Sequence, residues 1–288
     1  MTRFCFRTAT LSQLVALGLL AVFPTAAAEK SGVKFQGVSV RPGETVSAMV
    51  PLSAEEKTYA AIGGNRVPAN ALAILAVPPG FDPRTSWPVL VVFSTSDFRR
   101  QNHDDIHFYI TEAMGEGWLV LTGDGPERPS NDSNGWRAAM TLAALDALHR
   151  SFPQSIKWPV ACAGISGGAK RACLIAPLLA TAGNHIVGLY LAGINEGVLG
   201  EGYRIFHPGP DFLNTRIFIT SGQSDGIATP AQTERVMRLI QDGGFRQVRL
   251  EKFPAGHTVK RSFTREALRW FSSPSSPVKP NGRDGERG

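Results

Sequence analysis

Short apolar runs alternate with amphipathic segments along most of the chain after residue 70. An apolar run bounded by Gly, Pro or Asn is typical of a buried strand, whereas apolar residues spaced three and four apart predict a helix. The runs predict strands over 71–77, 88–93, 118–122, 159–163, 186–192, 215–220 and 247–253. The spaced positions predict helices over 106–114 (capped by Asp104-Asp105), 136–150, 169–179, 230–242 and 264–271.

This alternation predicts an α/β fold, with a mainly parallel sheet and helices on both faces. The domain is expected to span residues 29–272, with an edge strand over 45–52 in its otherwise poorly patterned first part. No run of amphipathic helices lies between residues 195 and 214, so we expect no large lid domain. Residues 273–288 are rich in Ser, Pro, Gly and charged side chains, which predicts a disordered tail.

One predicted strand-to-helix turn has the sequence Gly164-Ile165-Ser166-Gly167-Gly168, which fits the pattern G-x-S-x-G. A serine on such a tight turn has a strained backbone and an exposed hydroxyl, and the small residues around it let the chain turn without clashes. The N–H of Gly167 lies at the start of the helix, where it can stabilise an oxyanion. The pattern predicts Ser166 as a nucleophile rather than as an incidental serine in a glycine-rich turn.

A nucleophilic serine needs a base, and the base needs an acid that orients it. Asp225 and His257 each follow the C-terminal end of a predicted strand, where open α/β sheets place their sites. Taken singly, Asp225 suits an ordinary turn and His257 a loop. Their occurrence in the order Ser, Asp, His after successive strand ends favours a catalytic triad. Glu196, which follows the preceding strand, is the alternative acid.

Over about residues 70–272 the chain resembles the α/β-hydrolase superfamily. Within it, the chain looks most like the secreted esterases that include polyhydroxybutyrate depolymerase-like and feruloyl-esterase-like proteins. The likeness is carried by residues 77–82 and 87–93, by the turn around Ser166 and by the turns with Asp225 and His257. It implies an acyl-enzyme mechanism on carboxylic esters, with no metal or organic cofactor. Small-molecule and polymeric esters both stay open as substrates.

The chain departs from this family where an oxyanion hole is expected. The strand before the first helix usually ends in His-Gly or a similar pair, which helps to bind the oxyanion. Here it ends in Phe93-Ser94-Thr95-Ser96-Asp97. Because every residue except proline has a backbone N–H, we expect Thr95 or Ser96 to act as the second donor beside Gly167.

Two other functions fit the same residues. A serine peptidase of the prolyl-oligopeptidase type uses the same machinery, although no propeller-sized N-terminal domain is present in this sequence. The missing His-Gly pair suggests a non-catalytic binding protein on a hydrolase scaffold, but the retained Ser166, Asp225 and His257 argue against it.

Residues 1–28 have the features of a secretory signal peptide. Arg3 and Arg7 precede an apolar stretch over 11–23, and Ala26-Ala27-Ala28 offers a cleavage site. The alternative is an uncleaved membrane anchor, but the apolar stretch is too short for an ordinary span and no other run is long enough. We therefore expect a secreted or periplasmic protein with no stable membrane span after cleavage. The oligomeric state is not predicted.

The full chain has 30 Lys and Arg against 24 Asp and Glu, a formal net charge of +6. The basic residues occur in scattered pairs such as Lys170-Arg171, for which we expect a solvated surface position. They form no basic stripe with interleaved aromatics, so nucleic-acid binding is not expected. Cys162 and Cys173 fall in the strand and helix around Ser166, and a disulfide between them stays open. No group of residues has the spacing of a zinc site or of a nucleotide-binding loop.

Overall fold

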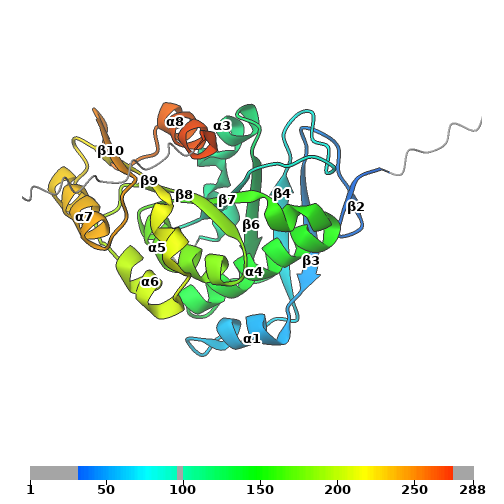
Figure 1. Cartoon of the computed structure of the whole chain (residues 1–288). Coiled ribbons are helices and arrows are strands. Elements are labelled where there is room, and N and C mark those ends of the chain that lie inside the picture. The colour runs from blue at the N-terminus through cyan, green and yellow to red at the C-terminus, as the bar shows by residue number, and fades with distance from the viewer. Residues whose placement is uncertain (1–31, 96–99, 275–288) are drawn as a thin grey trace, which may run out of the picture. The chain divides into compact units, whose positions relative to one another are not determined.

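The computed structural model describes residues 32–95 and 100–274 (Figure 1). The predicted signal peptide (1–28), Ser96 and most of the predicted tail lie outside these ranges. The strands are β1 (Lys34–Phe35), β2 (Val38–Ser39), β3 (Thr45–Pro51), β4 (Asn70–Ala76), β5 (Val89–Phe93), β6 (Leu119–Asp124), β7 (Pro159–Ile165), β8 (His185–Ala192), β9 (Arg216–Gly222) and β10 (Val248–Phe253). The α-helices are α1 (Ala54–Ala61), α2 (Asn102–Asp105), α3 (Ile110–Gly115), α4 (Asn134–Ser151), α5 (Gly167–Thr181), α6 (Leu199–Phe206), α7 (Pro230–Asp242) and α8 (Arg261–Ser272).

An eight-stranded sheet in the order β10-β9-β8-β7-β5-β6-β4-β3 forms the centre of the described chain. The strands from β10 to β6 pair in parallel. At the other end, β4 pairs antiparallel with β6, and β3 pairs antiparallel with β4 at the edge. The predicted mainly parallel sheet is therefore confirmed. The carboxyl ends of β7, β8 and β9 lie side by side, which brings the turns after them to one edge of the sheet.

Helices cover both faces of the sheet, as predicted. Every residue of β5 is buried, and successive side chains point to opposite faces. Val91 and Phe93 pack in the core under α4 and α5, whereas Leu90 and Val92 pack in the core under α3 and α8. Figure 1 shows α3 and α8 together above the sheet and α4 and α5 on its other side. Within the described residues, no helix is long and apolar enough to cross a membrane.

The short helix α1 lies in the first part of the chain, where no helix is predicted. It begins with a capping box: the Ser53 hydroxyl accepts from Glu56 N–H, and the Glu56 carboxylate accepts from Ser53 N–H. Only Glu56 and Ala60 of this helix are buried, so it has no apolar stripe. The only sequence signal for this helix is the Ser-x-x-Glu spacing of its capping box.

The prediction of a single helix over 106–114 is wrong. The chain instead forms α2, a 3-10 turn over Ile106–Phe108, and then α3. Asp124, at the end of β6, accepts from Asn102 N–H at 2.7 Å and from His103 N–H at 3.0 Å. A carboxylate that binds the first N–H groups of a helix fixes its start, so α2 begins before Asp104-Asp105 rather than after them.

A further helix, α6, lies in the stretch from 195 to 214, and a 3-10 turn over Pro210–Asn214 follows it. A Cβ atom on Gly202 would lie 2.9 Å from the carbonyl oxygen of Cys173, so α6 packs directly on α5. One short helix packed in this way is no lid, and the expectation of a fold without a large lid domain is confirmed.

Cys162 in β7 and Cys173 in α5 are both buried and both free thiols. The disulfide that the sequence leaves open is not formed. Burial raises the pKa of both thiols, which keeps them protonated at neutral pH. They fill space in the core as small apolar residues do.

Candidate active site

Ser166 lies in the turn between β7 and α5, with φ of 56° and ψ of −120°. A positive φ in a residue with a side chain costs on the order of 1–3 kcal/mol, and surrounding contacts must hold it. Ser166 N–H donates to the carbonyl of Ala192 at 2.9 Å, and the Ser166 carbonyl accepts from Ala169 N–H at 3.1 Å. The residue is half-buried. Ser166 thus has the strained turn that the G-x-S-x-G pattern predicts.

Two glycines let this turn pack closely on its neighbours. A Cβ atom on Gly164 would lie 2.2 Å from the carbonyl carbon of Gly168. A Cβ atom on Gly168 would lie 2.2 Å from the carbonyl oxygen of Phe93, the last residue of β5. Side chains cannot fit at either place, so both positions require glycine. Gly168 thereby brings the first turn of α5 against the loop that follows β5.

Asp225 and His257 are brought together by the turns after β9 and β10. His257 Nδ1 and Asp225 Oδ2 are 2.7 Å apart. The two turns pack on each other because a Cβ atom on Gly222 would lie 2.2 Å from the carbonyl oxygen of Gly256. In addition, Ser224 N–H donates across the turns to the carbonyl of Ala255 at 3.0 Å.

The Asp225 carboxylate is held in its ionised form. Burial acts to raise the pKa of Asp225, but hydrogen bonds from Ala228 N–H, His257 and Ile227 N–H together outweigh it and lower the pKa. The two backbone bonds are both 2.8 Å long and end on Oδ1. Because an ionised carboxylate only accepts, His257 Nδ1 is the donor in its contact with Asp225.

Ser166 and His257 both lie against the carboxyl end of β8. Ser166 binds the carbonyl of Ala192, and the next residue, Gly193, faces His257. A Cβ atom on Gly193 would lie 2.9 Å from His257 Cε1 and 3.4 Å from Asp225 Oδ2. Among the hydrogen bonds of the described residues, none joins Ser166 to His257. Hydrogen bonds between a nucleophile and its base are often long in enzymes without bound substrate.

Glu196, the alternative acid, lies apart from the histidine. Its side chain is 63% exposed and pairs with Lys170 Nζ at 3.1 Å. The structure therefore brings Asp225, and not Glu196, to His257.

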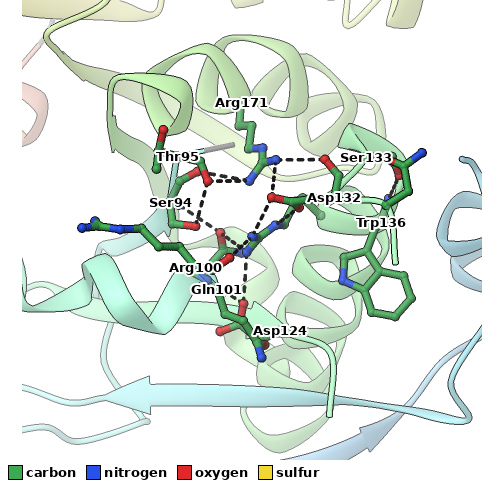
Figure 2. Close-up of polar contacts among 12 residues, drawn as sticks. Ser94, Thr95, Arg100, Gln101, Asp124, Asp132, Ser133, Trp136 and Arg171 are labelled. Atoms are coloured by element: carbon green, nitrogen blue, oxygen red, sulfur yellow. Dashed lines mark hydrogen bonds and ion pairs between the residues drawn. The ribbon is translucent and has the colours of Figure 1, made fainter. Parts of the chain in front are cut away.

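The backbone of Ser94 is tied down immediately after β5. Its N–H donates to Asn102 Oδ1 at 3.0 Å. Its carbonyl oxygen and that of Thr95 both accept from Arg171 Nη1, at 3.2 Å each (Figure 2). The loop that was expected to contribute to the oxyanion hole is thus attached to α5, the helix that begins next to Ser166.

Asp105, the last residue of α2, is a buried carboxylate close to this loop. Burial raises the pKa of Asp105, and the charge of Arg100 and then the backbone N–H of Thr95 act in the opposite direction. Arg100 pairs with Asp105 Oδ1 at 2.7 Å. Of the two second donors expected from the sequence, Thr95 lies within the described residues and Ser96 lies outside them.

Arg171 belongs to a buried charged network under this loop (Figure 2). Its Nη2 lies 2.8 Å from Asp132 Oδ2 and donates to the Asp132 carbonyl at 3.1 Å. On the other side of Asp132, Arg137 Nε donates to Oδ1 at 2.7 Å. Both arginine side chains are 2% exposed and that of Asp132 is 8% exposed. Burial, and then the charge of Arg137, lower the pKa of Arg171.

Arg137 connects this network to α2 and β6. Its Nη1 donates to Asn102 Oδ1 at 3.1 Å and lies 3.4 Å from Asp124 Oδ1. Its Nη2 donates to the carbonyl oxygen of Arg100. The network therefore binds both ends of the loop between β5 and α2.

Sequence reasoning misses this network, and the surface position expected for Arg171 is wrong. The spacing of Gly168, Arg171 and Ile175 by three and four residues places Arg171 on the buried face of α5, and this is a usable signal. Asp132 lies in a polar loop before α4, where no comparable pattern marks it.

A second histidine-carboxylate pair lies near the start of α2. His103 Nδ1 is 2.9 Å from Asp124 Oδ2. The hydrogen bond to Asp124 raises the pKa of His103, and burial opposes this rise. The His103 side chain is 39% exposed, whereas that of Asp124 is fully buried.

No family model and no curated protein matches the sequence. Solved structures with the same fold do match. A lid-less α/β serine hydrolase from Xanthomonas campestris has 14% identity and a TM-score of 0.54, with 84% of this chain and 99% of that protein covered. An α/β serine hydrolase homologue from Coxiella burnetii has 13% identity and a TM-score of 0.53, with 81% and 97% covered.

Two further structural matches have different names. An esterase from Pyrobaculum calidifontis has 13% identity and a TM-score of 0.53, with 81% of this chain and 83% of that protein covered. A candidate dipeptidyl aminopeptidase IV from Bacteroides ovatus has 13% identity and a TM-score of 0.52, with 79% of this chain covered. The chain spans about a third (35%) of that protein's length. Together, the matches show that the chain has the α/β-hydrolase fold without a lid.

Proposed function

We propose that the protein is a serine hydrolase that cleaves carboxylic esters through a covalent acyl-enzyme. The observation that carries this proposal is the 2.7 Å contact between His257 and Asp225, placed at the end of β8 beside the strained turn of Ser166. Nucleophile, base and orienting acid in this relation form a catalytic triad, which is recognised by geometry and roles rather than by sequence position.

In the proposed reaction, Ser166 Oγ attacks the acyl carbon, and His257 Nε2 takes the hydroxyl proton. Asp225 holds Nδ1–H, which keeps the imidazole in the tautomer that accepts at Nε2, and stabilises the imidazolium. His257 then gives the proton to the leaving alcohol as the ester C–O bond breaks. Water, deprotonated by His257, attacks the acyl-enzyme and releases the carboxylic acid and free Ser166.

The negative oxygen of the tetrahedral intermediates needs two hydrogen-bond donors. We assign one to Gly167 N–H, because N–H groups in the first turn of a helix have no intrahelical acceptor and the helix dipole favours an anion there. The second comes from the loop after β5. Thr95 N–H and Ser96 N–H are the two candidates in this loop.

The segment 1–28 supports a secreted or periplasmic location for this hydrolase, through a cleaved signal peptide. We propose that the substrates are small or polymeric esters, as the resemblance to secreted esterases implies. Terminal sequencing of the mature protein tests the location: we expect Glu29 as the first residue. A mature protein that retains residues 1–28 contradicts cleavage and favours a membrane anchor.

A serine peptidase is the second candidate, since the fold also matches a candidate dipeptidyl aminopeptidase over part of that protein's length. The same triad cleaves amides as well as esters. A panel of p-nitrophenyl esters of increasing acyl length and a dipeptidyl p-nitroanilide separates the two functions. We expect turnover of the esters, whereas preferential turnover of the anilide identifies a peptidase. A wild-type protein that turns over neither substrate, and that a fluorophosphonate does not label, is a binding protein on a hydrolase scaffold.

A further inference from the structure

We propose that Arg171 is a positioning residue for the oxyanion hole. It holds the carbonyl oxygens of Ser94 and Thr95 turned toward its own guanidinium. Their partial negative charge is thereby kept away from the place where the substrate oxyanion forms. This inference rests on the proposed hydrolase function. It assigns a catalytic consequence to a buried arginine that touches neither the substrate nor the triad.

The first support is the pair of hydrogen bonds from one guanidinium to two successive carbonyl groups. Arg171 Nη1 donates to the carbonyl oxygens of Ser94 and Thr95, at 3.2 Å each (Figure 2). A carbonyl dipole turned into an oxyanion site repels the developing charge, whereas donors fixed in advance stabilise it. Two carbonyl groups held on a cation cannot turn into that site without breaking charge-assisted bonds.

The second support is that Ser94 is held through both of its backbone polar groups. Its N–H donates to Asn102 Oδ1 at 3.0 Å, and its carbonyl oxygen accepts from Arg171 Nη1 at 3.2 Å. The backbone of Ser94 therefore cannot rotate without breaking a hydrogen bond at one of these two buried partners.

The third support is the position of Arg171 on the helix that begins at Gly167. A rigid helix couples the loop to the turn of Ser166, and Gly168 of the same helix packs on the carbonyl oxygen of Phe93. Asp132 accepts from Arg171 on one side and from Arg137 on the other, and so holds the guanidinium in place. A buried ion pair is weak evidence for stability, which makes a positioning role the better account of this network.

The test compares Arg171→Met, Arg171→Lys and a matched control, Arg216→Met. Arg216 is also a buried arginine that donates to backbone carbonyls, those of Trp270 and Phe271, but it lies at the amino end of β9, away from Ser166. For each variant, complete titration with a fluorophosphonate gives the concentration of active sites. Ester kcat and KM per titrated site, the affinity for a trifluoromethyl ketone, and Tm are then measured.

We expect Arg171→Met to lower kcat per titrated site by about 10²-fold, the scale of one lost oxyanion donor, with KM nearly unchanged. The affinity for the ketone, which mimics the tetrahedral intermediate, falls by a similar factor. Arg171→Lys, which keeps the charge but has a single donor nitrogen, recovers part of the loss. Arg216→Met lowers Tm but leaves kcat per titrated site close to that of the wild type.

If Arg171 has only a structural role, Arg171→Met lowers the titrated fraction and Tm but leaves kcat per titrated site unchanged. This result overturns the inference. Where Arg171→Met does not fold, Arg171→Lys decides: full kcat per titrated site in that variant also overturns it. Failure of the proposed function has a different signature, because the wild type itself then shows neither ester turnover nor labelling of Ser166.

Discussion

Gly193 lies directly against His257: a methyl group on its Cα would come within 2.9 Å of the ring carbon Cε1 and 3.0 Å of Nδ1. The glycine has φ of +53°, a conformation that costs a residue with a Cβ about 1–2 kcal/mol. The end of β8 therefore leaves no room for a side chain beside the His257 ring.

Gly193→Ala is expected to displace the imidazole and to lower kcat by about 10- to 100-fold, because small misplacements of a catalytic group are costly. Steady-state kinetics on a short p-nitrophenyl ester check this. Gly226→Ala is the matched control, since it lies beside Asp225 and a Cβ atom there meets nothing within 4 Å. Equal activity of the two variants contradicts the role given to Gly193.

Asp225→Asn is expected to lower kcat by as much as about 10⁴-fold, because an amide cannot hold His257 in the required tautomer. Glu196→Gln removes only an exposed pair with Lys170 and is expected to leave kcat nearly unchanged. Kinetics of both variants at the same pH rank the two candidate acids. A larger loss in Glu196→Gln contradicts the assignment of Asp225.

The proposed second oxyanion donor is a backbone N–H in the loop after β5, so we expect side-chain truncation there to be a mild change. Ser96→Ala is expected to cost little, whereas Ser96→Pro removes the N–H and lowers kcat by about 10²- to 10³-fold. Circular dichroism of the proline variant controls for misfolding. A folded Ser96→Pro protein with wild-type kcat excludes Ser96 as the donor.

Much of the geometry of the candidate site could be predicted because its sequence signals are local. The apolar run of β7, the glycines around Ser166 and the helical spacing of α5 all lie within one stretch of chain. Asp225 and His257 could be placed because each follows a strand, and parallel strands bring their carboxyl ends to one edge. These parts of the site depend on element order more than on side-chain packing.

The rest depends on contacts between distant segments. The start of α2 is fixed by Asp124, which comes from another strand, so local helix signals misplace it. Arg171 reads as a surface residue in its charged dipeptide, yet Asp132 and the carbonyl oxygens of Ser94 and Thr95 surround it with acceptors. Burial of a charge can be predicted only when its partners are known.

The pair of His103 and Asp124 links stability to pH. The pKa of His103 is raised in the folded state, so the protonated imidazole stabilises the folded protein. This contribution to the free energy of unfolding is fully present below the unfolded pKa, near 6.5, and is lost as pH rises through the folded pKa. We expect the Tm difference between the wild type and His103→Gln to be larger at pH 6 than at pH 9. Thermal unfolding across this range checks it, with the exposed His185→Gln as control. A difference that does not change with pH contradicts the link.

The central claim is that Ser166 is a nucleophile activated by His257 and Asp225. It is tested most directly by intact-protein and peptide mass spectrometry of the wild type and Ser166→Ala after treatment with a fluorophosphonate, together with ester turnover of both proteins. We predict a single phosphonyl adduct on Ser166 in the wild type. In a folded Ser166→Ala protein we predict no adduct and a kcat lower by about 10⁴- to 10⁶-fold. Labelling of another residue, or ester turnover at the wild-type rate in Ser166→Ala, contradicts the claim.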